Sequence, residues 1–244
     1  MKNIYTLFLI ALIAASCTDQ NDDAQYVVDQ ARIAAGNDKL DMAQVEFEFR
    51  DREYGVKRQN GKYEMVRLFK DSLDVIRDQV TNEGFQREVN GTVTEVPDSM
   101  AFKYTNSINS VIYFALLPYN LNDAAVIKSH LGTEAIKDKE YYKIKVTFEQ
   151  EGGGKDFEDE FIYWVAKDTY FIDYLAYSYL TDGGGMRFRE AYNPRTVNGI
   201  RALDYINYKP KTDVKLEAIG KAFEAGELEE LSRIELVNFN VELL

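Results

Sequence analysis

Residues 98–123 constrain the fold of this chain more than any other segment. Apolar residues recur there at helical spacing, and every side chain from residue 111 to residue 117 is apolar. A helix end that is apolar on all sides must be buried, and so short a run is well below the about 20 residues of a membrane span. Asp98 or Ser99 is expected to cap the start of this helix, and Pro118 is expected to end it.

The segments on either side of this helix predict an antiparallel β-sheet. In residues 45–50 every second side chain is apolar, which is typical of a strand with one face in water. Asn-Gly pairs at residues 60–61 and 90–91 have the residue types of two-residue hairpin turns. Further strands are predicted at residues 63–69, 71–81, 85–96, 141–148, 157–167, 170–180, 186–192 and 196–208.

A helix is expected near the N-terminus. Residues 23–36 carry apolar side chains at helical spacing, with Asp22 or Asp23 as the cap. Gly36 suits the position that follows a helix, because glycine readily adopts the left-handed conformation found there. The first element of the fold is therefore predicted to be a helix.

The C-terminal half is expected to contain two more helices. Residues 123–131 are predicted to form a short helix, capped by Asp123 or the residue before it, with His130 near its negative end. Residues 213–226 are also predicted to be helical. Residues 231–241 are predicted to form a last strand, and its docking onto the main sheet stays open.

Length and charge limit the classes of protein to consider. The chain has 244 residues and no internal linker rich in Pro or Ser, so one large β-rich domain is the default. We expect a main domain at residues 24–212 and a C-terminal segment at residues 213–244. The formal net charge of −12 argues against a nucleic-acid partner, since binding to phosphates requires Lys and Arg.

The N-terminus has the layout of a secretory signal. Residues 1–16 combine a short basic head, an apolar run and small residues, and the single cysteine, Cys17, follows directly. This layout resembles that of bacterial lipoproteins, in which signal peptidase II cleaves before a lipidated cysteine. The resemblance implies that Cys17 anchors the protein to a membrane and that residues 17–23 are an anchored, acidic tether. The alternative is a secreted protein cleaved nearby with one free thiol.

The order of the expected elements resembles the carrier-type fold of the LolA, LolB and LppX-like proteins. That fold implies an α+β, mostly antiparallel β structure: an open, strongly bent sheet, or incomplete barrel, with helices on its concave side. A closed barrel of the lipocalin kind stays open as an alternative. Four segments of the chain carry more specific motifs: residues 106–123, 173–179, 183–195 and 199–210. Together they resemble an uncharacterised family of Bacteroidota lipoproteins, some of which carry an aldolase label.

No pattern in the sequence predicts catalysis, a metal site or a cofactor. His130 is the single histidine and Cys17 is expected to be blocked, so neither a catalytic triad nor a zinc site can be assembled. A Schiff-base aldolase would need a lysine desolvated in a pocket, whereas Lys143 and Lys145 are expected on the polar side of their strand. The aldolase label is therefore not supported.

The sequence thus favours a non-enzymatic, membrane-anchored lipoprotein that binds a lipid or another apolar molecule between sheet and helix. The expected location is the outer membrane of the cell envelope, facing the surface or the periplasm. Alternatives are an envelope hydrolase that uses carboxylates, and a structural or partner-binding lipoprotein with a filled core. The residues expected to line the cleft are Phe47, Phe49, Ile108, Ile112 and Leu116.

Overall fold

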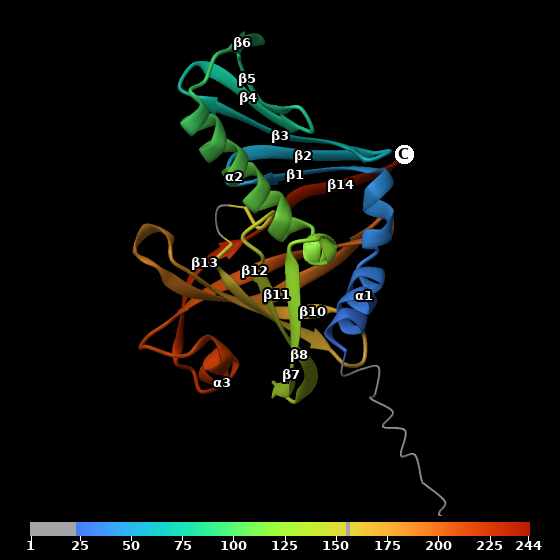
Figure 1. The fold of residues 1–244 in the computed structure, drawn as a ribbon, viewed down its shortest axis with the longest axis vertical. Coiled ribbons are helices and arrows are strands. Elements are labelled where there is room, and N and C mark those ends of the chain that lie inside the picture. The colour runs from blue at the N-terminus through green and yellow to red at the C-terminus, as the bar shows by residue number, and fades with distance from the viewer. Residues whose placement is uncertain (1–22, 155–156) are drawn as a thin grey trace, which may run out of the picture.

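Two seven-stranded antiparallel sheets form the frame of the protein (Figure 1). The computed structural model describes residues 23–154 and 157–244, so the expected signal peptide, Cys17 and most of the tether lie outside the described residues. In spatial order the first sheet contains β14 (Val237–Leu243), β1 (Ala43–Phe49), β2 (Arg52–Gln59), β3 (Lys62–Asp71), β4 (Asp74–Thr81), β5 (Gly84–Val89) and β6 (Thr92–Thr94). The second contains β13 (Leu228–Ile234), β12 (Ile200–Pro210), β11 (Gly185–Val197), β10 (Ile172–Tyr179), β9 (Glu160–Ala166), β8 (Lys139–Phe148) and β7 (Val126–Ile136).

The chain passes from the second sheet to the first between β13 and β14, where it bends. Strand β13 borders the second sheet and β14 borders the first, and only residues 235–236 separate them in the chain. In the described chain β6 and β7 remain unpaired edges, so neither sheet closes on itself. The prediction of an open, bent α+β fold is therefore confirmed, and the closed lipocalin-type barrel is not formed.

The hairpin turns of the first sheet have the predicted chemistry. Asn60 and Gly61 join β2 to β3 with φ angles of 53° and 76°. Asn90 and Gly91 join β5 to β6 with φ angles of 52° and 77°. Such left-handed pairs match the right-handed twist of the strands that they connect, and Asn-Gly accepts them at little cost.

Helix α1 (Ala24–Ala34) begins and ends as predicted. Its N-cap is Asp23, whose carboxylate accepts a hydrogen bond from the backbone N–H of Gln25 at 2.9 Å. Gly36 follows with a φ of +74°, and a Cβ there would lie 1.9 Å from the carbonyl oxygen of Gly199. The helix end therefore sits directly on the turn between β11 and β12, and only glycine fits this contact.

Helix α2 (Asp98–Ala115) packs against both sheets. Ile108 and Ile112 are buried against the first sheet, whereas Tyr113 and Phe114 pack on the second. This double contact explains why the end of the helix is apolar on every side. The expected side-chain cap is wrong: Pro97 occupies the N-cap position, and the start of the helix has no side-chain cap hydrogen bond.

The short helix expected at residues 123–131 is wrong. This segment is mostly strand β7, which pairs with β8 and alternates between more and less exposed side chains. The nearest helical structure is the four-residue 3₁₀ helix η3 (Tyr119–Asn122), which precedes this segment. Gly132 lies at a register shift of the strand rather than after a helix, and His130 is a strand residue. Pairing along a long neighbour outweighed the local capping signal.

The C-terminal segment is also more divided than predicted. Residues 213–226 contain only η5 (Leu216–Ala218) and the six-residue α3 (Ile219–Glu224). The single strand expected at residues 231–241 is two strands, because the chain changes sheets between them. At this bend Asp204, only 4% exposed, accepts hydrogen bonds from the backbone N–H of Leu236 and from the Arg195 guanidinium, both at 2.9 Å.

Lys143 does not lie on a polar face. Helix α3 and η5 cover the second face of the second sheet, and beneath them Lys143 is 7% exposed. Its ammonium donates to Glu134 and to the backbone carbonyl of Glu217, and it lies 5.4 Å from the centre of the Trp164 ring. The second sheet is therefore buried on both faces. The alternation of apolar residues and lysines along residues 141–148 predicts one face in water, and for Lys143 this prediction is wrong.

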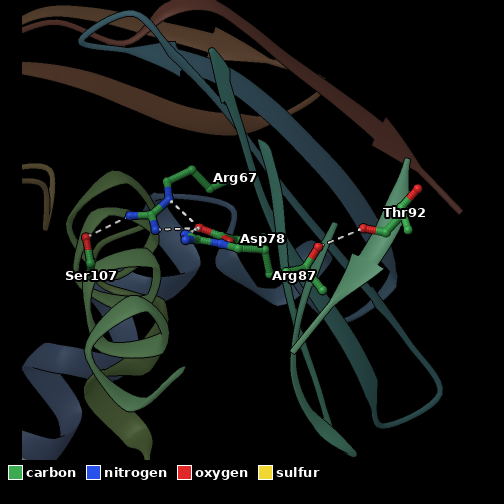
Figure 2. A network of polar contacts seen from close by, with 6 residues as sticks. Arg67, Asp78, Arg87, Thr92 and Ser107 are labelled. Atoms are coloured by element: carbon green, nitrogen blue, oxygen red, sulfur yellow. Dashed lines mark hydrogen bonds and ion pairs between the residues drawn. The ribbon is translucent and has the colours of Figure 1, made fainter. Parts of the chain in front are cut away.

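A buried ionic network holds α2 to the first sheet (Figure 2). Asp78 of β4 is fully buried and pairs with Arg67 of β3 and Arg87 of β5, each at 2.6 Å. Arg67 also donates to the hydroxyl of Ser107 on α2 at 3.0 Å, and Arg87 lies 3.9 Å from the centre of the Tyr104 ring on the same helix. Asp78 thus joins three strands directly, and the two arginines bound to it connect these strands to the helix.

We predict that Asp78→Asn lowers the free energy of unfolding by about 3–5 kcal/mol, because it leaves two arginines without their buried counterion. Urea unfolding followed by circular dichroism measures the change. The control is Glu88→Gln, whose partly exposed pair with Arg77 spans 3.8 Å and should contribute less than about 1 kcal/mol. Equal effects of the two substitutions would contradict the importance of the network.

Candidate functional site

A cavity of about 640 Å³ lies between α2 and the face of the second sheet on which α2 packs. This volume falls within the range of about 300–1,000 Å³ that is usual for small-molecule sites. Its wall is formed by α2, by the end of β1, by η3 and the segment after it, by strands β7 to β13 and by the loop between β8 and β9. The aromatic side chains in the wall are Phe49, Tyr113, Phe114, Phe148, Phe161, Tyr177, Tyr179 and Tyr205.

The aromatic rings of the wall contact one another. The ring centre of Tyr177 lies 5.4 Å from that of Phe161 and 5.5 Å from that of Phe114. Phe148 meets Phe161 edge to face at 5.8 Å. These separations are typical of favourable aromatic pairs. The result is a stiff apolar wall that joins α2 to three strands of the sheet.

Strand alternation selects which residues reach the cavity. Leu175 and Tyr177 of β10 are paired in register with Arg189 and Arg187 of β11. Arg189 is in turn opposite Asn207 of β12. Because paired residues share a face of the sheet, both arginines point to the cavity side, and the phenylalanine between them packs under α3 on the other side.

Arg189 is the most deeply buried cation of the cavity wall, at 8% exposed. Its guanidinium carbon lies 4.0 Å from the centre of the Phe114 ring, and its Nη2 donates to the hydroxyl of Tyr177 at 3.1 Å. Among the described residues no carboxylate forms an ion pair with it. Its Nε is buried and has no hydrogen-bond partner.

Two tyrosines of the cavity wall, Tyr113 and Tyr205, keep their protons at neutral pH. Burial raises the pKa of Tyr205 to about 12, against the opposing influence of the Arg189 and Arg201 charges. Burial likewise raises the pKa of Tyr113 to about 12, and its hydroxyl lies 3.1 Å from that of Tyr163. Neutral hydroxyls cannot balance the positive charge of Arg189.

The five residues expected to line a cleft fall into two groups. Phe47, Ile108, Ile112 and Leu116 are at most 2% exposed and belong to the core between the first sheet and α2. Phe49 is partly buried and lies in the wall of the cavity. The expected lipidation site, Cys17, lies outside the described residues.

Sequence reasoning missed the residues of the second sheet that form most of the wall. The order Arg187, Phe188, Arg189 carried a usable signal, because alternate residues of a strand share a face. The signal was ambiguous, since either the arginines or the phenylalanine could have faced water. Only the cover that α3 provides over Phe188 decides the orientation.

The described part of the chain contains no group of three potential metal ligands. Two carboxylates, Asp123 and Asp159, do line the cavity. None of the described helices is both long and apolar enough to cross a membrane. The cavity wall thus combines an aromatic surface with the buried Arg189 guanidinium and with these two carboxylates.

Tyr205→Phe should flatten the dependence of stability on pH above pH 10. The folded protein holds the Tyr205 proton up to a pKa of about 12, whereas the unfolded chain loses it near the ordinary value of 10.0. The contribution is complete below pH 10 and is lost as the pH rises to 12, by up to about 2–3 kcal/mol. Urea unfolding between pH 9 and about pH 12 measures it, and identical slopes for both proteins would contradict it.

Comparison with solved structures finds distant likenesses. A LolA superfamily protein from Nitrosomonas europaea is 12% identical, with a TM-score of 0.49 over 91% of this chain and 94% of that one. A DUF1329 family protein from Desulfovibrio piger is 13% identical, with a TM-score of 0.44 over 90% and 93%. The lipoprotein LppX from Mycobacterium tuberculosis is 12% identical, with a TM-score of 0.30 over 66% and 91%.

The structural neighbours therefore include the LolA and LppX types that the order of elements resembles. At these identities and TM-scores no activity transfers from them to this chain. A search of curated proteins finds no match. The sequence model of a family of unknown function, DUF6503, matches residues 2–236. The chain belongs to this DUF6503 family.

Proposed function

We propose that this protein is a membrane-anchored lipoprotein of the cell envelope that binds one apolar or amphiphilic molecule without catalysing a reaction on it. The observation that carries the proposal is the cavity of about 640 Å³ between α2 and the second sheet. A half-open space of this size, lined by aromatic side chains and a few polar groups, is typical of small-molecule sites and therefore supports a binding site.

The wall chemistry supports an apolar occupant. Phe114, Phe161 and Tyr177 form one continuous aromatic surface there, and ligand sites are usually lined by such surfaces with a few polar groups. A ligand that covers these rings removes apolar area from water, which stabilises the complex by about 25 cal/mol per Å² before the costs of ordering.

The membrane anchor rests on the sequence. Cys17 follows a signal-like segment directly, and the acidic residues after it would form a tether to the fold that starts at Asp23. The lipid would hold the protein at the outer membrane, on the surface or the periplasmic side. The folded part would then take up its ligand next to the bilayer.

The cavity hypothesis predicts that the chain from Thr18 onward, which contains every described helix and strand, co-purifies with an apolar molecule. Extraction with organic solvent followed by mass spectrometry detects it. Ser110→Trp should reduce the bound amount several-fold, because Ser110 lines the cavity. Lys103→Trp, also on α2 but outside the cavity wall, is the matched control. A protein that carries no such molecule and takes up no apolar fluorophore would sink the proposal.

The anchor hypothesis predicts that Cys17→Ala releases the protein from the membrane fraction. The physical reason is that the described residues contain no spanning helix, so a lipid on Cys17 would be the main source of membrane affinity. Immunoblots of membrane and soluble fractions give the measurement, together with the loss of acyl mass. Unchanged fractionation of the variant would contradict lipidation as the anchor.

A further inference from the structure

Arg189 is a buried cation for which the described residues supply no carboxylate partner. Of its guanidinium donors, one is used by the Tyr177 hydroxyl, and Nε is buried without a partner. Transfer of a charge into such surroundings is unfavourable unless the charge is paired. A stable fold that retains it suggests that an anion from outside occupies the adjoining space.

The other buried arginine of the described residues is treated differently: Arg67 pairs with the buried carboxylate of Asp78 at 2.6 Å. Even the partly exposed Arg195 pairs with the buried carboxylate of Asp204 at 2.9 Å. The chain has 41 acidic residues against 29 basic ones, so partners are abundant. Within the described residues, neither carboxylate of the cavity wall forms an ion pair with Arg189. The missing partner is therefore specific to the cavity.

Two more polar groups of the wall flank Arg189. Arg187 lies two residues earlier on the same face of β11, and its Nη1 donates to the backbone carbonyl of Met186 at 2.8 Å. Asn207 is directly opposite Arg189 on β12, and its side-chain oxygen is buried without a partner. Rotation of this amide keeps the contact with Ser232, whose hydroxyl can donate, and presents an N–H instead.

We propose that the ligand of the cavity is an amphiphile with a carboxylate or phosphate headgroup, and that Arg189 binds this headgroup, assisted by Arg187. The proposal rests on the proposed function, because it names the class of molecule for the same cavity. A guanidinium presents a planar fork of N–H donors that suits both anions. The apolar tail would lie along Phe114 and Phe161.

The position of Phe114 makes Arg189 suitable for this task. The guanidinium lies 4.0 Å from the centre of the Phe114 ring, and Tyr177 holds one of its nitrogens. Its orientation is thus fixed before an anion arrives, which reduces the entropy lost on binding. The same ring borders both the headgroup and the tail, so α2 would contact the whole ligand.

The test uses the chain from Thr18 onward, stripped of bound molecules, with two probes: a dansyl-labelled undecanoic acid and its methyl ester. Fluorescence titration should show the acid bound about 10- to 100-fold more tightly than the ester. Arg189→Gln should remove this preference while the ester affinity stays, and Arg189→Lys should keep part of it. Arg52→Gln is the matched control, because Arg52 lies 4.6 Å from the Phe69 ring outside the cavity wall.

Three outcomes would overturn the headgroup assignment or what it rests on. Equal affinity of the wild type for acid and ester, a comparison that needs no variant, would overturn the headgroup while the proposed function stands. Competition by inorganic phosphate as strong as that by the acid would show a free-anion site instead. Failure of both probes to bind would overturn the proposed function itself. Circular dichroism of each variant confirms that it is folded.

Discussion

Helix α2 is the constraint on which the rest of the structure depends, because it must satisfy two sheets at once. Its first half is fixed on β3, β4 and β5 by the Arg67–Asp78–Arg87 network and by the contact with Ser107 (Figure 2). Buried charges tolerate little displacement, since any movement leaves one of them unpaired. The network therefore fixes the distance between the second half of the helix and the second sheet, and the cavity is the space between them.

This arrangement separates stability from binding along one helix. Ile108 and Ile112 belong to the core of the first sheet and are essentially unexposed. Tyr113 and Phe114, which follow at once in the sequence, contact the second sheet and the cavity instead. A run that is apolar all round thus has one face that plugs a core and another that covers a cavity.

Much of the frame could be predicted because its signals are local. Asn60-Gly61 fixes a turn and Asp23 a helix start, and each requires only its neighbours. Residues 123–131 and Lys143 were misread because their state depends on other elements. Residues 123–131 pair with the following strand β8, and Lys143 is covered by η5, where it donates to the carbonyl of Glu217, 74 residues later. The cavity belongs to the second class, since its wall combines α2 with strands that come much later in the chain.

The same limit explains why Arg189 could not be recognised from the sequence, and why it matters once the fold is known. An arginine among 41 acidic residues would normally be assumed to find a counterion. The sheet instead sets it between Phe114 and Tyr177, with neutral tyrosines nearby, away from every carboxylate it could pair with among the described residues. An unpaired buried charge weakens the empty protein, and an anion that pairs with it strengthens the complex. The stability that the empty protein loses at Arg189 is therefore regained when an anionic ligand binds, and it favours anionic over neutral ligands. An unfilled apolar core would show no such preference for charge.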